Sequence, residues 1–450
     1  MSTPSPVFTA PLVLRARGTF DALDALTRRA VIDRAPSRQS VVREHTAAII
    51  ERVRVGGDDA LRALAREFDG VALADIAVPR ECWTHALDAL DPRLRVALER
   101  AARNITTVHA AFLPSATQVS PEPGITVGRR PDPLQRVGVY APAGRAAYPS
   151  SLLMGAIPAR VAGVQEVIVC TPPSADGHPS PIVLAAAALA NVDSVFAIGG
   201  AGAIAAMAFG TPTVPRVDRI VGPGNAYVAE AKRQVSTHVT IDAPAGPSEL
   251  LVLADVTANA SVIARELLAQ AEHDPDAAVI ALLCGDAVEP FANEIETVLA
   301  ALVMATPRAA IVRESLAARG AIVTVPSIAR GIAVANEWAA EHLLLVVAEN
   351  LREPTLAALR NAGTVFVGAS SSVAFGDYMT GANHVLPTAG AARRYSGLST
   401  LDFVRWTTWQ SVTPSAAAGM ADDVSRFANA EGLPAHAAAA RSWSSTGSSS

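Results

Sequence analysis

The stretch EVIVCTPPSADGHPSPIVLAAAALANVDSVFAIGG, residues 166–200, contains two short apolar runs on either side of an alanine-rich segment. The runs, residues 166–173 and 194–200, have the length and composition of strands that lie buried inside a sheet. The segment between them, residues 180–192, has the composition of a helix. A buried strand, a helix and a second buried strand in succession predict a β-α-β unit with parallel strands.

The same alternation continues along much of the chain. Further apolar runs lie at residues 136–142, 219–224, 249–255, 278–285, 321–327 and 364–370. Runs of this kind in two groups favour two similar domains over one large sheet. We therefore expect an α/β fold of two similar Rossmann-like parallel-sheet domains, with a helical N-terminal region and a C-terminal helical tail. In the N-terminal region, residues 36–115 have helical periodicity that breaks at Gly56 and Gly57, and after Gly397 the strand signal stops.

The composition is that of a globular chain and excludes several classes of function. The 450 residues are too many for one core, and 50% are hydrophobic against 18% charged. A net charge of −5 argues against nucleic-acid binding, which needs clustered positive charge. We expect no membrane span and no signal peptide, because no apolar run of about 18 residues lacks charges or turn signals. Three scattered cysteines fit a reducing cytoplasm.

Glycine-bearing turns follow several of the predicted strands. They lie at residues 141–144, 198–203, 221–225 and 243–249. Glycine at the carboxyl end of a parallel strand lets the backbone approach a ligand. None of the turns is a complete dinucleotide fingerprint or a Walker A loop, so each alone is explained by an ordinary strand-to-helix turn. Together they favour a nucleotide or another phosphate-bearing ligand.

Gln270 and His273 are candidate metal ligands. They are three residues apart on a helix that is expected to open near Asn259, so both would project from one face. Three other segments pair an acid with an imidazole, namely Glu341 with His342, Asp377 with His384, and Glu431 with His436. Because no suitable cysteine set exists, we expect a mixed nitrogen and oxygen zinc site built from Gln270, His273, one carboxylate and one further histidine. Spacing alone does not choose among these candidates.

Seven motifs in order resemble the histidinol dehydrogenase family over roughly residues 35–440. They are GVYAPAGRAAYPSSLLM (138–154), VGPGNAYVAEAKRQV (221–235), DAPAGPSELLVLAD (242–255), QAEHD (270–274), EHL (341–343), GDYMTGANHVLPTAG (376–390) and AEGLPAH (430–436). The resemblance implies an NAD-dependent, zinc-requiring oxidation of L-histidinol to L-histidine through the aldehyde. It also implies a cytoplasmic enzyme of histidine biosynthesis.

The resemblance also implies roles for individual residues. The implied zinc ligands are Gln270, His273, Asp377 and His436, and the implied catalytic acid–base pair is Glu341 and His342. The implied NAD contacts are Tyr140 and Asn225. The implied substrate contacts are Ser248, His384 and Glu431, together with His342 and the four zinc ligands. Imidazole titrates near neutrality, so His342 suits the base that removes the hydroxyl proton, and Glu341 suits proton removal at the aldehyde stage.

The same resemblance implies a domain plan and a partner. Residues 1–35 would form an N-terminal arm, and residues 36–138 with 247–395 a first Rossmann-like domain that carries the zinc and catalytic residues. Residues 139–246 would form a second Rossmann-like domain on the NAD side. Residues 396–450 would form a tail that crosses into the partner of a homodimer, where Glu431 and His436 complete the neighbouring site.

One position departs from the family pattern and supports rival interpretations. The family's IGGAQA turn carries a glutamine that touches NAD, and here Gly202 occupies that place. Losing such a hydrogen bond removes on the order of 1 kcal/mol. The departure favours two alternatives, a related zinc- and NAD-dependent dehydrogenase of another small polyol or amino alcohol, and an inactive paralogue that serves as a binding subunit. A metal hydrolase is a weaker alternative, because it would leave the glycine-rich turns unexplained.

Overall fold

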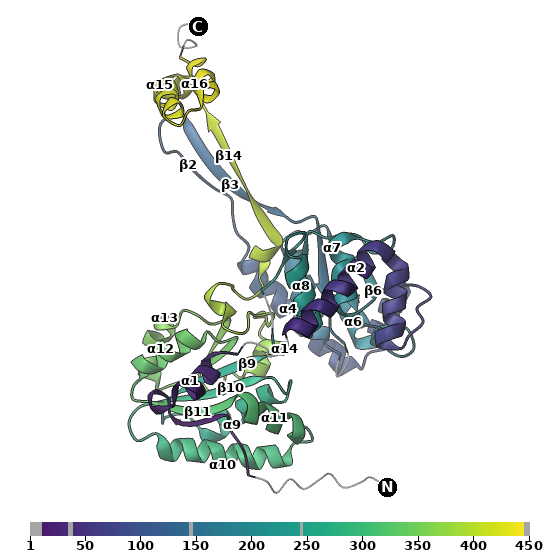
Figure 1. The fold of residues 1–450 in the computed structure, drawn as a ribbon, viewed down its shortest axis with the longest axis vertical. Coiled ribbons are helices and arrows are strands. Elements are labelled where there is room, and N and C mark those ends of the chain that lie inside the picture. The colour runs from purple at the N-terminus through teal and green to yellow at the C-terminus, as the bar shows by residue number, and fades with distance from the viewer. Residues whose placement is uncertain (1–10, 35–38, 144–146, 244–245, 445–450) are drawn as a thin grey trace.

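The computed structural model describes residues 11–34, 39–143, 147–243 and 246–444. These residues form two bodies, each built on a parallel sheet, and a long arm that projects from one of them (Figure 1). Residues 1–10 of the predicted N-terminal arm, and parts of the turns at 141–144 and 243–249, lie outside the described residues. Within the described residues, no helix combines the length and the apolar character needed to cross a lipid bilayer.

The first body contains a five-stranded parallel sheet with the order β6-β5-β4-β7-β8. Its strands are β4 (Arg136–Tyr140), β5 (Glu166–Thr171), β6 (Ser194–Ala197), β7 (Arg219–Val221) and β8 (Thr240–Ile241). The connecting helices are α5 (Pro149–Val161), α6 (Pro181–Leu189), α7 (Gly200–Phe209) and α8 (Ala226–Val235). Four of these strands are the apolar runs that the sequence predicts, and their residues form one continuous core with the helices around them.

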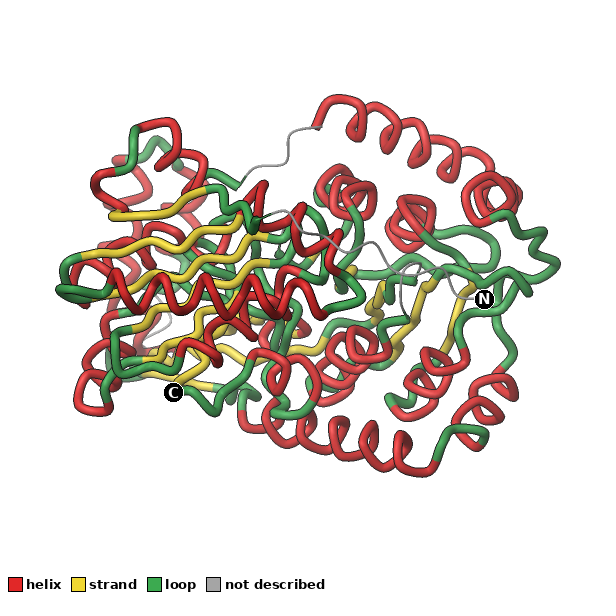
Figure 2. The backbone as a smooth tube through the Cα atoms, turned by 90° about the horizontal axis from the view of Figure 1, so that it is seen from below, coloured by secondary structure: helices red, strands yellow, loops and turns green. Residues whose placement is uncertain are grey.

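The second body contains a six-stranded parallel sheet with the order β1-β11-β10-β9-β12-β13. Its strands are β1 (Ala16–Thr19), β9 (Glu249–Ala254), β10 (Ala278–Cys284), β11 (Gly320–Val325), β12 (His342–Val346) and β13 (Thr364–Val367). Its helices are α1 (Ala25–Ile32), α9 (Ala260–Ala271), α10 (Glu289–Ala305), α11 (Ala309–Arg319), α12 (Ile328–Trp338), α13 (Glu349–Ala358) and α14 (Val373–Tyr378). Figure 2 shows helices on both faces of the strands. The predicted α/β class with parallel sheets is confirmed.

The six-stranded sheet has a separate core cluster on each of its faces. Successive residues of a strand point to opposite faces, and β9 follows this rule. Leu250 and Val252 belong to one cluster, whereas Leu251 and Leu253 belong to the other. Burial on both faces explains why these strands are continuous apolar runs in the sequence.

The helices of residues 39–111 pack on the five-stranded sheet. They are α2 (Gln39–Leu64), which turns at Gly57, α3 (Arg80–Asp88) and α4 (Pro92–Ala111). Helix α2 packs against α7 and α8, α3 against α6, and α4 against α5. This packing differs from the predicted grouping of residues 36–138 with 247–395. Amphipathic periodicity indicates that a helix covers an apolar surface, but it carries no information about which sheet supplies that surface.

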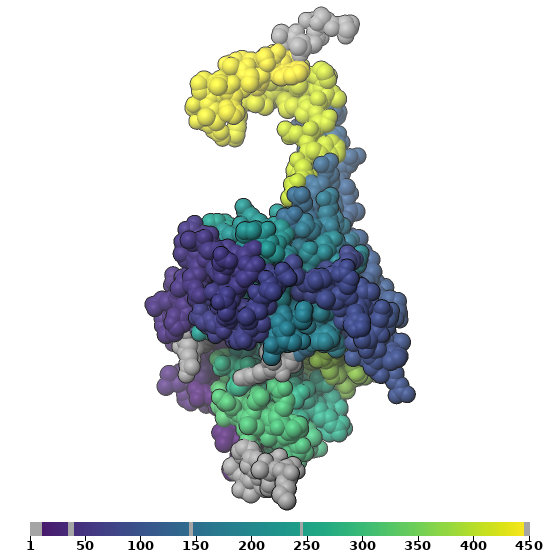
Figure 3. Space-filling model, turned by 90° about the vertical axis from the view of Figure 1, so that its right-hand side faces the viewer, coloured from purple at the N-terminus to yellow at the C-terminus, as the bar shows by residue number. Residues whose placement is uncertain are grey.

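The arm is a three-stranded antiparallel sheet with two helices at its end (Figures 1 and 3). Its elements are β2 (Thr117–Val119), β3 (Ile125–Pro133), β14 (Val404–Val412), α15 (Pro414–Ala430) and α16 (Pro434–Arg441). The prediction that the chain after Gly397 is only helical is therefore wrong. Strand β14 buries none of its nine residues fully, so it lacks the apolar run by which the other strands are recognised. Short turns of other helix types lie at Phe20–Ala22, Ala65–Asp69, Ala391–Arg393 and Thr400–Phe403.

Candidate functional site

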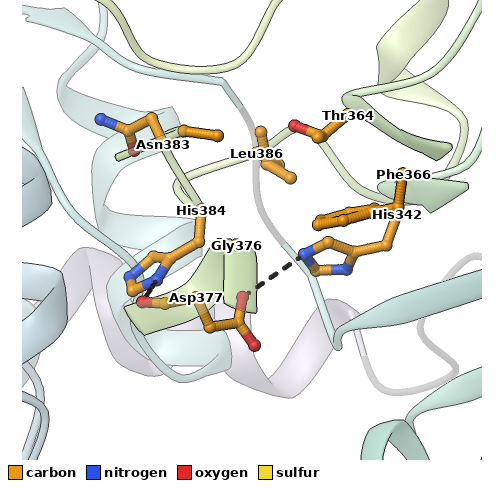
Figure 4. A pocket seen from close by; sticks show the side chains of 9 residues that line it. His342, Thr364, Phe366, Gly376, Asp377, Asn383, His384 and Leu386 are labelled. Atoms are coloured by element: carbon orange, nitrogen blue, oxygen red, sulfur yellow. Dashed lines mark hydrogen bonds and ion pairs between the residues drawn. The ribbon is translucent and has the colours of Figure 1, made fainter. Parts of the chain in front are cut away.

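A narrow hollow brings together three of the residues proposed from the sequence, namely His342, Asp377 and His384 (Figure 4). It lies at the start of β12 and β13 and beside α14. The other residues that line it are Thr364, Phe366, Gly376, Ala382, Asn383 and Leu386. The Asn383 side chain donates to the Met154 carbonyl of α5 at 2.8 Å, so this loop also touches the five-stranded body.

His342 is buried and presents one free nitrogen to the hollow. Its Nδ1 lies 3.0 Å from the Glu249 carbonyl oxygen. A carbonyl only accepts, so Nδ1 carries a proton and donates it. The Nε2 atom has no hydrogen-bond partner among the described residues and lies 3.8 Å from Asp377 Oδ1. This atom could therefore form a further hydrogen bond only with a partner that enters the hollow.

The pKa of His342 results from opposing effects. Burial lowers it, but the Glu341 and Asp377 carboxylates and the hydrogen bond to the Glu249 carbonyl together raise the pKa of His342 to about 9. The imidazole is consequently cationic at neutral pH while both carboxylates are free. Because opposite charges lie this close, any cation bound to Asp377 would lower the pKa of His342 again.

Glu341 is buried in the turn between α12 and β12. Its Oε2 accepts the backbone N–H of Glu249 at 2.6 Å and lies 3.5 Å from His342 Nδ1. Ser248, another proposed substrate contact, is the residue before Glu249, and its carbonyl accepts the N–H of Ala278 at 3.0 Å. The structure thus gathers Ser248, Glu341 and His342 around the first residues of β9 and β12.

The end of α9 lies next to α14. Glu266 of α9 accepts the N–H of Val373, the first residue of α14, at 3.1 Å. Gln270, which is buried, follows one turn later on α9, and Asp377 follows one turn later on α14. Burial and the nearby carboxylates, including Asp377 and Glu272, raise the pKa of the Tyr378 hydroxyl. One hydrogen bond therefore joins α9, which carries Gln270, to the start of α14, which carries Asp377.

The sequence predicts that His273 and Gln270 share one face of a helix, but in the structure His273 lies beyond the end of that helix. Helix α9 ends at Ala271, and His273 lies in the following turn with its Nδ1 3.3 Å from the Gln270 carbonyl oxygen. Pro275 follows four residues after the end of the helix, and helical angles are disfavoured at the residue before a proline, so the helix does not continue through this turn. The turn nevertheless keeps His273 next to Gln270.

His384 faces Asp377 across the hollow. Its Nδ1 lies 2.9 Å from the Asp377 carbonyl oxygen, which only accepts, so Nε2 is the unprotonated nitrogen of the neutral ring. Burial lowers the pKa of His384, although the Asp377 carboxylate opposes this shift. The hollow thus has a hydrogen-bond acceptor, Nε2 of the neutral His384 ring, and a donor, the Nε2–H of the cationic His342 ring.

Glu431 and His436 lie far from this hollow. Glu431 ends α15 and His436 belongs to α16, both at the tip of the arm, and both side chains are exposed (Figure 1). Among the described residues, no three His, Cys, Asp or Glu side chains are close enough to hold a metal ion. The four proposed zinc ligands therefore do not meet within one copy of the chain. Their nitrogen and oxygen donors nonetheless suit zinc chemically.

Tyr140 and Asn225 both lie at the carboxyl edge of the five-stranded sheet. Tyr140 ends β4 and is buried, and its hydroxyl accepts the N–H of Gly200 at 3.1 Å. Burial raises the pKa of Tyr140 to about 12, so the hydroxyl keeps its proton. The Asn225 oxygen caps α8 by accepting the N–H groups of Tyr227 and Val228 at 3.0 and 3.1 Å. Among the polar side-chain atoms of Asn225, the amide nitrogen is left to contact a ligand.

A buried ion pair also lies at this edge, and none of the sequence motifs predicts it. Lys232, the only lysine of the chain, donates from Nζ to the Gly222 carbonyl at 3.0 Å and pairs with Asp242. Asp242 in turn accepts the Gly222 N–H at 2.8 Å. A Cβ on Gly222 would lie 2.1 Å from the Tyr140 carbonyl oxygen, so only glycine fits there. The single lysine among 37 basic residues was the sequence signal that could have identified this pair.

Gly202 lies inside α7. A Cβ at this position would point toward α2 and meet Leu64 Cδ1 at 3.0 Å. Gly200, at the start of the same helix, has a φ of +61°, and a Cβ there would meet nothing within 4 Å. Because Gly202 has no side chain, Leu64 of α2 can approach α7 closely at this position.

Comparisons with known proteins agree with this geometry. A model of the histidinol dehydrogenase family matches residues 32–443. The chain is 46% identical over 391 residues to histidinol dehydrogenase of Methanothermobacter thermautotrophicus, covering 87% of this chain and 91% of that protein. It is 45% identical over 409 residues to that of Nitrosomonas europaea, covering 90% and 93%.

The fold agrees as well. The crystal structure of histidinol dehydrogenase from Elizabethkingia anophelis matches with a TM-score of 0.90 and 34% sequence identity, covering 97% of this chain and 99% of that chain. The sequence match and the structural match both extend through the two bodies and the arm. The chain therefore belongs to the histidinol dehydrogenase family, a family of oxidoreductases.

Proposed function

We propose that this chain oxidises L-histidinol to L-histidine in two successive steps through the aldehyde, as a cytoplasmic enzyme of histidine biosynthesis. The observation that carries the proposal is the buried His342–Glu341 pair, with a free Nε2 atom that faces Asp377 in the hollow. Membership of the family supplies the substrate. NAD would accept the hydride, and zinc would orient the substrate through its imidazole and amine nitrogens.

The zinc ligands would be Gln270, His273 and Asp377 of one copy and His436 of a second copy. In support, Asp377 lines the hollow, and one hydrogen bond joins α14 to α9, the helix that carries Gln270. His436 stands exposed at the tip of the arm, where it has no way to reach the hollow of its own chain. We therefore propose a homodimer with shared sites, in which Glu431 would contact the substrate of the same neighbouring site.

His342 and Glu341 would divide the proton transfers. In the first step, Nε2 of His342 takes the hydroxyl proton while a hydride leaves the same carbon, which becomes the aldehyde carbon. In the second step, Glu341 takes a proton from the water that adds to the aldehyde before the second hydride leaves. A cation at Asp377 would lower the pKa of His342 toward the range that a base requires. Ser248 and His384, which flank this pair, would hold the substrate.

The cofactor would lie against the five-stranded sheet, with Tyr140 and Asn225 as contacts. In support, the two sheets have the same strand order. If the strands of each sheet are numbered along the chain from β4 and from β9, the order across each sheet is 3-2-1-4-5. The six-stranded sheet has β1 as an additional strand beside the third. This shared strand order is that of dinucleotide-binding units, so we infer two Rossmann-like domains. The N-terminal ends of α7 and α8 meet the edge where Tyr140 and Asn225 lie, and such helix ends favour a pyrophosphate.

A second function is favoured by one observation, the glycine at position 202. A related dehydrogenase of another small polyol or amino alcohol would retain the fold and the metal ligands while it differs at this contact. The experiment compares NADH formation with L-histidinol and with a panel of other alcohols. Substantial turnover of another alcohol, with none for L-histidinol, would replace the proposed substrate.

Replacing His273 by Ala tests the metal assignment in the same assay. We expect His273→Ala to lose bound zinc, measured by elemental analysis after purification without chelators, and to lose activity with it. His238→Ala is the matched control, because His238 is exposed in the turn between α8 and β8, at the edge of the five-stranded sheet opposite to Tyr140 and Asn225. Full zinc content in His273→Ala would remove His273 from the ligand set. A wild-type protein that neither holds zinc nor forms NADH would be a binding subunit.

A further inference from the structure

Arg34 is a buried arginine that comes from the N-terminal segment, just after α1. Its guanidinium donates to both carboxylate oxygens of Glu249, from Nε at 2.7 Å and from Nη2 at 3.1 Å. It also donates to the carbonyls of Trp338 and Ile32, at 2.7 and 2.9 Å. The guanidinium carbon lies 3.8 Å above the Trp338 ring. A planar group held by this many contacts has one orientation only.

Glu249 connects this arginine to the proposed catalytic pair. Its backbone N–H donates to Glu341 Oε2 at 2.6 Å, and its carbonyl accepts from His342 Nδ1 at 3.0 Å. Its side chain also accepts the N–H of Ala389, at 2.7 Å, from the loop that carries His384. One residue thus fixes Glu341 and His342 through its backbone while its own carboxylate is held by Arg34.

Arg34 also offsets the repulsion between two buried carboxylates, those of Glu249 and Glu341. Glu249 and Glu341 are both less than a tenth exposed and are neighbours, and two such carboxylates repel each other in a poorly hydrated site. Burial and the Glu341 charge raise the pKa of Glu249, whereas Arg34 opposes this shift. Each side chain of the ion pair is at most 4% exposed, so water does not substitute for the guanidinium.

We propose that Arg34 and Glu249 are positioning residues for the reaction. Arg34 holds the Glu249 carboxylate at both of its oxygens, and Glu249 then presents its N–H to Glu341 and its carbonyl to His342. The hydrogen bond at Nδ1 directs the free Nε2 into the hollow, and the bond at Oε2 orients the carboxylate of Glu341. The segment before α2 is consequently part of the active site, although Arg34 touches neither substrate nor cofactor. This inference rests on the proposed function.

A purely structural ion pair would behave differently in a double-mutant cycle. If Arg34 acts through Glu341, then removing Arg34 should matter little once Glu341 has lost its carboxylate. If the pair only holds the fold together, the two losses of activity should multiply. Arg319→Met is the matched control, since Arg319 donates to the Arg34 carbonyl at 2.8 Å and holds the same segment without touching Glu249.

The experiment measures kcat and KM for aldehyde oxidation in Arg34→Met, Glu341→Gln, the double variant and Arg319→Met, each with its zinc content and thermal midpoint. We expect Arg34→Met to lower kcat about 10- to 100-fold with little change in KM, because a small displacement of a catalytic group has effects of this size. The double variant should be no slower than Glu341→Gln. Arg319→Met should retain kcat within about twofold, and Arg34→Lys, which keeps the charge but not the two-point contact, should recover part of the loss.

The outcomes separate this inference from the proposed function. If Glu341→Gln oxidises the aldehyde normally, the catalytic role of Glu341 is wrong. If Glu341→Gln is slow but Arg34→Met is not, or if the two losses multiply, the positioning role is wrong. Should Arg34→Met not fold, the cycle is measured with Arg34→Lys and with the charge-neutral pair Arg34→Met/Glu249→Gln, for which the same additivity criterion decides.

Discussion

The two parallel sheets share a strand order but carry the proposed site residues at opposite edges. In the five-stranded sheet, Tyr140, Gly222 and Asn225 lie at or after the carboxyl ends of their strands. In the six-stranded sheet, Glu249 and His342 are the first residues of β9 and β12, and they are aligned in register with the starts of β10 and β13. Ligands of open α/β sheets usually bind at the carboxyl edge, so the site proposed on the six-stranded sheet would be an exception.

The difference follows the chemistry that each edge would have to supply. Helices α7 and α8 begin at the carboxyl edge of the five-stranded sheet, and the partial positive charge of a helix N-terminus favours an anion such as a pyrophosphate. Helices α9 and α12 end at the amino edge of the six-stranded sheet, where the partial negative charge of a helix C-terminus favours a metal ion or an ammonium group. One edge suits an anionic cofactor and the other a cationic substrate with zinc.

Each edge is also held by a buried ion pair. Lys232 with Asp242 fixes the glycine turn at the five-stranded edge, and Arg34 with Glu249 fixes the strand starts at the six-stranded edge. The first pair binds backbone groups of Gly222 on the turn itself, whereas Glu249 of the second pair contacts the proposed catalytic side chains through its backbone. We therefore expect the two ion pairs to affect different steps. The pair of Lys232 and Asp242 should affect NAD binding, and the pair of Arg34 and Glu249 should affect the oxidation itself.

Lys232→Met gives the largest expected loss of stability. Asp242 would remain buried without its cation, and breaking such a pair costs about 3–5 kcal/mol of the free energy of unfolding. The free energy is measured by urea unfolding, and any folded fraction should show a higher KM for NAD with unchanged zinc content. Arg233→Met is the control, because Arg233 is an exposed neighbour on α8 whose pair with Glu230 contributes less than about 1 kcal/mol. If Lys232→Met and Arg233→Met lose the same free energy of unfolding, the buried pair of Lys232 and Asp242 stabilises the fold no more than an exposed pair does.

His109 should make the five-stranded body sensitive to acid. It lies on α4, is 1% exposed, and neither ring nitrogen has a hydrogen-bond partner among the described residues. Burial lowers the pKa of His109 to about 4, below its usual value of 6.5. Stability from the neutral ring is then complete above pH 6.5 and is lost as the pH falls toward 4, by about 3 kcal/mol.

The variant His109→Phe keeps a ring of similar shape beside Phe112 but has no proton to gain. Urea unfolding at pH 7 and pH 4 should show a smaller acid-induced loss in this variant than in the wild-type protein. His85→Phe is a control on α3 at a less buried site. Identical acid dependence in the wild-type protein and His109→Phe would mean that other groups set the acid sensitivity.

Gly202→Gln gives the smallest expected effect and tests the cofactor edge directly. A side chain at this position must displace Leu64, which packs from α2, so we expect a small loss of stability. If the glutamine reaches NAD, one hydrogen bond contributes on the order of 1 kcal/mol and KM for NAD falls several-fold. Gly202→Ala provides the packing change without the hydrogen bond. An unchanged KM in a folded Gly202→Gln protein would show that position 202 faces only α2.

Local features of the sequence predict much of the fold and part of the site. The apolar runs predict four strands of the five-stranded sheet and four strands of the six-stranded sheet, because burial on both faces is recorded in the residues of the strand itself. The acid–imidazole pairs also single out His342, Asp377 and His384, which the structure brings together. Their catalytic and ligand roles stay predictions.

Other features depend on contacts between distant segments. Strand β14 has exposed residues on both faces and acquires its place only by pairing with β3, far away in the sequence. The N-terminal helices carry an apolar face, but only packing assigns them to the five-stranded sheet. Arg34 resembles any surface arginine until the folded chain places it against Glu249, 215 residues away.

By itself, the sequence determined the α/β class, the main strands and the kinds of side chain available for chemistry, since periodicity and composition are properties of short segments. The tertiary structure alone decided at which edge of each sheet the proposed site residues lie and which buried charges surround them. Those features arise from contacts between residues hundreds of positions apart, and no short segment records its eventual partner. The same long-range packing separates His436 from the other proposed ligands within one chain.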